Sequence, residues 1–77
     1  MNSREAVVNR INELCSEKQI SYYILSYRSA VPMSTLMNII HGKNPTITTI
    51  SKICDGFEIS IKEFFSAEFF DTCKDDD

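Results

Sequence analysis

Pro32 and Gly42 lie close together in the middle of the chain, and the segment between them has room for only one short helix. Proline is favoured in the first turn of a helix, so we expect this helix to begin near Pro32. Gly42 suits a left-handed C-cap and Pro45 blocks continuation, so the helix should end there. Its buried side is marked by three apolar residues at helical spacing, Leu36, Ile39 and Ile40. Such a chain must build its core from several short helices.

Two helices are predicted ahead of this segment. Residues 4–18 have the apolar spacing of an amphipathic helix, with Ser3 as its expected N-cap. Ser21 is expected to cap a second helix that ends at Tyr27 or Arg28. Residues 29–32 are too few for anything except a tight turn between helices.

Two more helices are predicted after it. Thr46 is a suitable N-cap for a fourth helix that Gly56 should stop, and Ser60 caps a short fifth. Residues 66–73 could form a sixth helix of one or two turns, and residues 75–77 are expected to be disordered. Because no strand-like alternation occurs, the prediction is a compact all-α domain of five helices over 1–66. Residues 67–77 then form a C-terminal extension with an acidic tail.

Length and composition agree with one small domain. A chain of 77 residues buries a marginal core unless its helices pack economically or it dimerises. The hydrophobic fraction of 43% and the charged fraction of 25% are ordinary for a soluble globular protein. No apolar run of membrane-spanning length and no signal-peptide core is present, so we expect a cytoplasmic protein without membrane contact.

The three cysteines and the single histidine give no sign of a metal or redox site. Cys15, Cys54 and Cys73 lie far apart and without ligand spacing, so we interpret them as reduced packing residues. No clustered carboxylates, phosphate-binding glycine loop or nucleophile motif is present. We therefore expect no cofactor, no metal and no enzymatic activity.

Residues 20–45 have the spacing of a helix-turn-helix, at about 21–41. Over about residues 8–65 the chain resembles the lambda-repressor-like (phage repressor/Cro, Xre-type) helix-turn-helix DNA-binding family. The matching residues are Ile20-Ser21, Leu25-Ser26, Val31-Pro32, Ser34-Thr35-Leu36, Ile39, Gly42-Lys43-Asn44-Pro45, Ile47, Ile50, Ile53-Cys54, Phe57-Glu58-Ile59-Ser60 and Phe64-Phe65.

The resemblance implies a five-helix domain that binds double-stranded DNA in a sequence-specific way and regulates transcription, in this interpretation as a repressor. The helix starting near Pro32 would enter the major groove. The net charge of −3 is unfavourable for DNA. Residues 68–77 hold five acids and one base, whereas the other 67 residues hold six acids and seven bases. DNA binding must therefore come from a few well-placed residues.

Carried over position by position, the family's base-reading residues fall on Met33, Ser34, Met37 and Asn38. Asparagine can pair with adenine and methionine can pack on a thymine methyl, which suggests a site rich in A·T pairs. The implied phosphate contacts are Tyr22, Thr35, His41 and Lys43, together with the backbone amides at Gly42 and Lys43. Tyr22 replaces the family's usual glutamine.

Other departures concern the fold. Ala30 replaces the usual turn glycine. Cys15 and Ile40 replace the arginine and glutamate that often form an interhelical ion pair in the family. Because both partners become apolar together, we expect these two side chains to touch.

Two questions stay open at this level. The aromatic residues between Phe64 and Cys73 could form a homodimer interface, or Phe69 and Phe70 could cover the monomer's own core. The methionines of the recognition helix could instead form an apolar surface. The chain would then be a protein-interaction module, or an antitoxin-like partner, on the same fold with weak or lost DNA binding.

Overall fold

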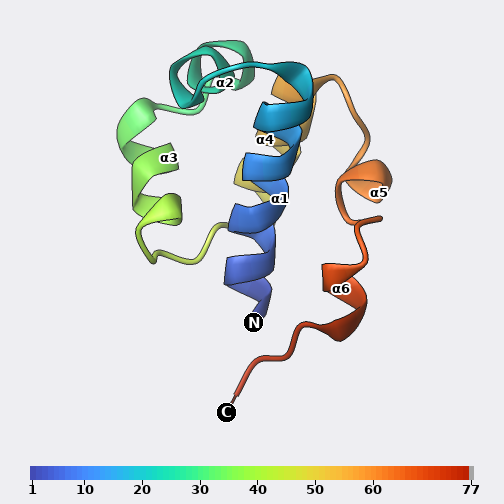
Figure 1. The fold of residues 1–77 in the computed structure, drawn as a ribbon. Helices are drawn as coiled ribbons and strands as arrows, with labels where there is room; N and C mark the ends of the chain where they lie inside the picture. The colour runs from blue at the N-terminus through green and yellow to red at the C-terminus, as the bar shows by residue number, and fades with distance from the viewer. Residues whose placement is uncertain (77) are drawn as a thin grey trace.

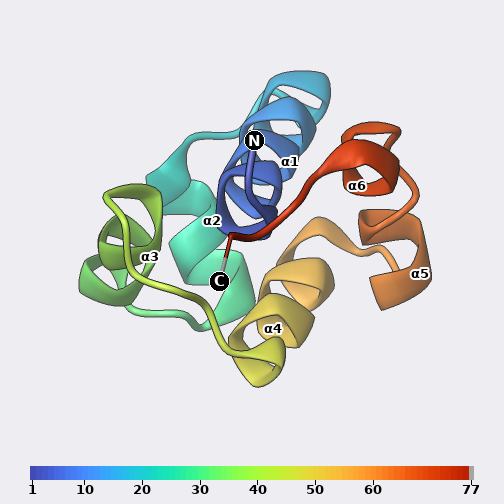
Figure 2. The same ribbon diagram turned by 90° about the horizontal axis from the view of Figure 1, so that it is seen from below.

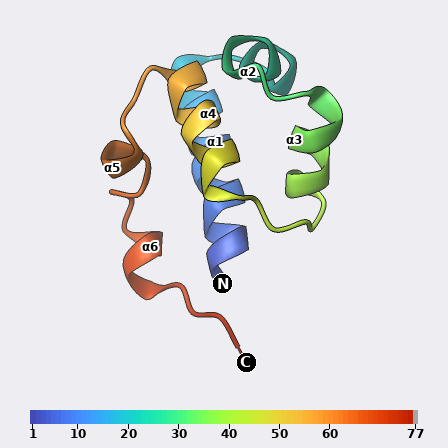
Figure 3. The same ribbon diagram turned by 180° about the vertical axis from the view of Figure 1, so that it is seen from behind.

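A computed structural model describes residues 1–76 of the protein and contains helices without strands in that range (Figure 1). The helices are α1 (Ser3–Lys18), α2 (Tyr22–Ser29), α3 (Met33–Ile40), α4 (Ile47–Phe57), α5 (Ile61–Phe64) and α6 (Phe69–Thr72). Helices α1 and α4 lie at the centre and α2 crosses one end of them, while α3 and the α5–α6 segment lie on opposite sides (Figures 1 and 3). The all-α prediction is confirmed, and the sixth helix is present. No helix within residues 1–76 is long and apolar enough to cross a membrane.

Side-chain oxygens cap the starts of four of these helices. Ser21, Thr46 and Ser60 each accept a hydrogen bond from the backbone N–H three residues later, as the sequence predicts. Helix α1 is capped by Asn2 and not by Ser3. Asn2 and Glu5 form a reciprocal capping box, which satisfies two backbone donors that the first turn would otherwise leave free.

Helix α4 continues through Gly56 to Phe57, so the prediction that Gly56 stops the helix is wrong. Gly56 is instead a packing residue. A Cβ atom at this position would lie only 2.8 Å from the Cβ of the buried Ser29. The glycine thus allows α2 and α4 to approach closely, and the left-handed residue that ends α4 is Glu58.

The core draws side chains from the first five helices. Its largest fully buried residues are Ile11, Leu14, Leu25, Leu36, Ile53, Cys54, Phe57 and Phe64. Cys15 and Cys54 are buried in this cluster, and burial raises the pKa of both thiols. They are therefore protonated, unreactive packing residues, as expected.

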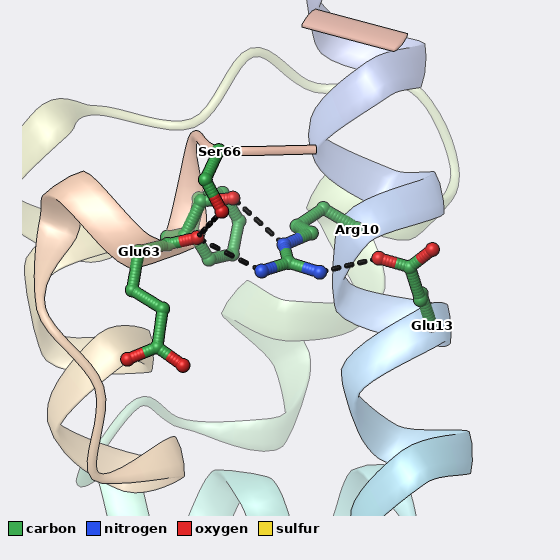
Figure 4. A network of polar contacts seen from close by, with 5 residues as sticks. Arg10, Glu13, Glu63 and Ser66 are labelled. Carbon is green, nitrogen blue, oxygen red and sulfur yellow. Dashed lines mark hydrogen bonds and ion pairs between the residues drawn. The ribbon is translucent and has the colours of Figure 1, made fainter. Parts of the chain in front are cut away.

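A buried arginine connects α1 with the end of α5 (Figure 4). The Arg10 Nε donates to the Phe64 carbonyl oxygen at 2.7 Å, and its Nη2 donates to the Glu63 carbonyl oxygen at 2.8 Å. Its Nη1 pairs with the carboxylate of Glu13. The Glu63 carbonyl also accepts from the Ser66 hydroxyl at 2.7 Å, so Arg10 adds to a capped helix end at Glu63 and supplies a donor for the Phe64 carbonyl.

The C-terminal aromatic residues stack on one another. The rings of Phe65 and Phe70 lie 4.8 Å apart, centroid to centroid, and both pack against the core. Phe64 is fully buried beside them, and Phe69 stacks on Phe70 at 5.1 Å. Phe70 therefore covers the monomer's own core, one of the two alternatives left open by the sequence.

The C-terminal tail is attached to the start of α1 (Figure 2). The Lys74 N–H donates to the Met1 carbonyl oxygen at 3.0 Å. The Ser3 N–H donates to the Asp75 carboxylate at 2.8 Å, and the Ser3 hydroxyl reaches both oxygens of that carboxylate. The expectation of disorder is thus wrong for Asp75, while Asp77 lies outside the described residues.

These contacts predict an acid-dependent stability. Hydrogen bonds from the Ser3 backbone and hydroxyl lower the pKa of Asp75. A lowered folded-state pKa stabilises the protein above the unfolded value of about 3.9, and this stabilisation is lost as the pH falls through the folded pKa. Asp75→Asn should therefore lower the melting temperature at pH 7, and its difference from wild type should shrink toward about pH 2.

Circular dichroism melts at both pH values measure this difference. Asp76→Asn is the matched control, because it removes the same charge from an exposed neighbour. Equal melting temperatures for Asp75→Asn and Asp76→Asn at pH 7 would contradict the prediction.

Candidate nucleic-acid interface

Helices α2 and α3 are joined by a tight turn whose centre, Ala30, has a left-handed backbone with φ 57°. Val31 is buried, and its carbonyl oxygen accepts a hydrogen bond of 2.6 Å from the Ser26 hydroxyl. Its N–H donates to the Ser29 hydroxyl. These bonds fix the turn without the glycine that the family usually has there, and they set the direction in which α3 leaves α2.

Helix α3 buries one side and exposes the other. Leu36 and Ile39 are buried, as predicted, and hold the helix against the rest of the domain. Ser34 and Asn38 are exposed and lie one turn apart on the outer side. Two of the predicted base contacts therefore share an open face that begins next to the turn.

The two methionines of α3 differ in their environment. Met33 is 38% exposed at the start of the helix. Met37 is half-buried and packs against the core cluster. Met37 is therefore less available to a base than the sequence predicts, because part of its side chain fills space beside the core.

The predicted phosphate contacts do not all point outward. The Tyr22 hydroxyl donates to the side-chain oxygen of Asn12 on α1, and the Tyr22 ring packs against the core. Its proton is therefore used within the protein. Thr35 is half-buried, whereas His41 and Lys43 are exposed in the loop after α3.

The backbone amides of that loop are also occupied. The Lys43 N–H donates to the Asn38 carbonyl oxygen at 2.8 Å, and the Gly42 N–H donates to the Ile39 carbonyl oxygen at 3.3 Å. They close the end of α3, in the manner of helix C-caps. The expectation that these amides bind phosphate is therefore not supported, and the side chains of Lys43 and His41 are the donors that stay exposed in this loop.

Ile40 does not lie where the paired replacement with Cys15 suggested. It is half-buried beside the first half of α1, next to Arg4, Val8 and Asn9. Cys15 belongs to the core cluster, on which Ile40 does not pack. Val8 and Cys15 are about two helical turns apart along α1, so the predicted contact is not supported.

Sequence reasoning also missed two exposed aromatic residues on α2. Tyr23 is 69% exposed and Tyr27 is 80% exposed, and they lie one turn apart. Neither tyrosine belongs to the apolar stripe that contains Leu25, and this signal could have identified both as exposed. Tyrosine hydroxyls are among the groups that bond DNA phosphates.

The charge is separated along the chain. None of the eleven acidic residues lies within residues 18–54, which include all of α2 and α3 and most of α4. The bases of that segment are Lys18, Arg28, Lys43 and Lys52. The exposed face of α3 is thus presented by a segment without carboxylates, despite the net charge of −3. Such a segment is compatible with a polyanion.

Two short helices joined by a tight turn, the second with an open polar face, place this chain among the helix-turn-helix DNA-binding domains. The model of the Cro/C1-type HTH DNA-binding domain family matches residues 10–69. The chain belongs to this family, which confirms the resemblance found in the sequence. No curated protein and no solved structure matched it.

The turn yields a prediction about stability. A left-handed backbone costs an L-residue about 1 kcal/mol or more, and glycine avoids most of this cost. Ala30→Gly should therefore raise the free energy of unfolding by about 0.5–1 kcal/mol, whereas the β-branched Ala30→Val should lower it. Urea unfolding followed by circular dichroism measures both changes. A glycine variant no more stable than wild type would show that the turn is unstrained.

Proposed function

We propose that this protein is a transcriptional regulator that binds a specific duplex sequence by placing α3 in the major groove. It would act as a repressor in the cytoplasm, by covering its site and without catalysing a reaction. The observation that carries the proposal is the exposed polar face of α3 with Ser34 and Asn38, presented by a segment without acidic residues. Membership of the Cro/C1-type family supports it.

In this proposal Asn38 pairs with an adenine edge, Ser34 bonds a base edge, and Met33 contacts a thymine methyl. Met37 contributes only through the part of its side chain that is not packed on the core. The site would then be rich in A·T pairs.

The backbone of the duplex would be held by Lys43, His41 and Thr35. Lys43 and His41 are exposed in the loop that follows α3, and Thr35 lies in the first turn of that helix. Tyr22 is proposed to act mainly through its hydrogen bond to Asn12, which fixes the start of α2 against α1.

Selection of bound duplexes from a random pool tests this proposal. Asn38→Ala should lose discrimination at one base pair, worth about 1–3 kcal/mol, because a bidentate base contact is removed. Lys43→Ala should weaken binding to all sequences and reduce the log–log salt slope by about 0.9, because one phosphate contact is lost. Enrichment of no sequence would contradict the proposal.

We also propose a homodimer through the region from Phe64 to Cys73, since proteins of this kind read two half-sites about one helical turn apart. Within this region, Phe69 and Cys73 are only partly covered, and Ile61 just before it is 41% exposed.

Multi-angle light scattering at micromolar concentration, with and without the selected duplex, should give the mass of a dimer in at least the bound state. Phe69→Asp should shift the protein toward a monomer, because a buried unpaired charge opposes association. Lys62→Asp, at an exposed position outside the proposed interface, is the control. A wild-type monomer under both conditions would exclude the dimer.

A second candidate function is a protein-interaction module on the same fold. The exposed side chains of Met33, Tyr23 and Tyr27 favour it, because they offer apolar area on the helix-turn-helix. Salt dependence separates the two functions. DNA binding weakens steeply with salt, whereas association through apolar anchors changes little.

A further inference from the structure

The far end of the recognition helix is held by a residue outside the helix-turn-helix. Helix α3 packs mainly on α2, and Leu36 and Ile39 are its buried residues. At its C-terminal end, the Nη1 of Arg4 donates to the Ile39 carbonyl oxygen at 3.0 Å, in a partly buried contact. Arg4 belongs to the first turn of α1, 35 residues away in the sequence.

This contact meets an electrostatic need of α3. The Ile39 carbonyl already accepts the Gly42 N–H, but the carbonyls at the end of a helix carry a partial negative charge, which a cation stabilises further. Helix α3 has no basic residue in its last turn, and no side chain caps its first turn. Arg4 therefore supplies from α1 the positive charge that the sequence of α3 does not provide.

The turn that carries Arg4 is fixed on both sides. The capping box of Asn2 and Glu5 closes its backbone. The neighbouring Ser3 is bonded to Asp75 of the tail. Seen from below, the start of α1 lies between α3 and α6 (Figure 2). Arg4 thus extends toward α3 from a backbone that is held by its own capping box and by the C-terminal tail.

We propose that Arg4 is a positioning residue for DNA recognition, which fixes the C-terminal half of α3 at the angle that base contacts require. This inference rests on the proposed function. Base contacts depend on geometry to a fraction of an ångström, whereas phosphate contacts depend mostly on charge. Loss of the hydrogen bond from Arg4 to the Ile39 carbonyl should therefore reduce specific binding more than non-specific binding.

The first experiment needs no DNA. Amide hydrogen exchange of the free protein, followed by NMR, should become faster at residues 39–43 in Arg4→Gln and stay unchanged at Ile53 and Cys54 in α4. Arg4→Lys keeps the charge and should restore much of the protection. Unchanged exchange at the end of α3 in Arg4→Gln would overturn the inference, whether or not the protein binds DNA.

The second experiment uses the duplex selected by the wild type and a scrambled duplex. Arg4→Gln should weaken specific binding by about tenfold, as expected for a lost hydrogen bond to a charged group. The scrambled duplex should bind nearly as before and the salt slope should not change. Arg4→Lys should recover part of the specific affinity. Lys62→Gln removes a positive charge from α5, on the other side of the molecule, and controls for net charge (Figure 1).

Two results would overturn the positioning role. Equal loss on both duplexes with a salt slope reduced by about 0.9 would make Arg4 a direct phosphate contact. A lower melting temperature with unchanged affinity of the folded protein would make it a purely structural residue. If the wild type selects no duplex, the proposed function fails, and the exchange experiment still decides the contact between Arg4 and α3.

Discussion

One buried guanidinium, that of Arg10, joins the beginning of the chain to its C-terminal third. A buried charge is costly unless it is paired and hydrogen-bonded, and here each guanidinium nitrogen has a partner, supplied by two backbone carbonyls and one carboxylate. The two carbonyls belong to the end of α5, so the contact holds the Phe64 ring in the core and starts the aromatic stack that continues to Phe70. Helix α3 lies on the opposite side of the domain, away from this contact, and has an exposed face (Figures 1 and 3).

Local signals in the sequence account for most of the fold. The apolar spacing and the capping residues Ser21, Thr46 and Ser60 locate the helices because each signal acts within one turn of the chain. The prediction that Gly56 ends α4 is wrong because a glycine can either end a helix or permit close packing. Only the position of Ser29, 27 residues earlier, decides between these roles. The prediction that Asp75 is disordered is wrong for a similar reason, since its partner Ser3 lies at the other end of the chain.

The candidate site divides in the same way. The exposure of Ser34 and Asn38 follows from the buried stripe of the same helix, so the sequence predicts it. The engagement of Tyr22 with Asn12 does not follow from the sequence, because it depends on how α2 crosses α1. Arg4 and Arg10 could not be predicted either. Both arginines bond to backbone carbonyls, which every residue has, so the residue types do not show which carbonyl is bound.

Because residues 18–54 contain no acid, the charge of the domain is unevenly distributed, although its net charge is negative. The carboxylates gather on α1, at the end of α4, and along α5, α6 and the tail. The field repels a polyanion near the tail and the start of α1, where Glu5 lies beside the end of α3, whereas a polyanion that approaches the start of α3 meets little opposing charge. The field would therefore exert a torque that turns α3 toward the duplex before contact. Orientation, more than overall attraction, would govern how often an encounter succeeds.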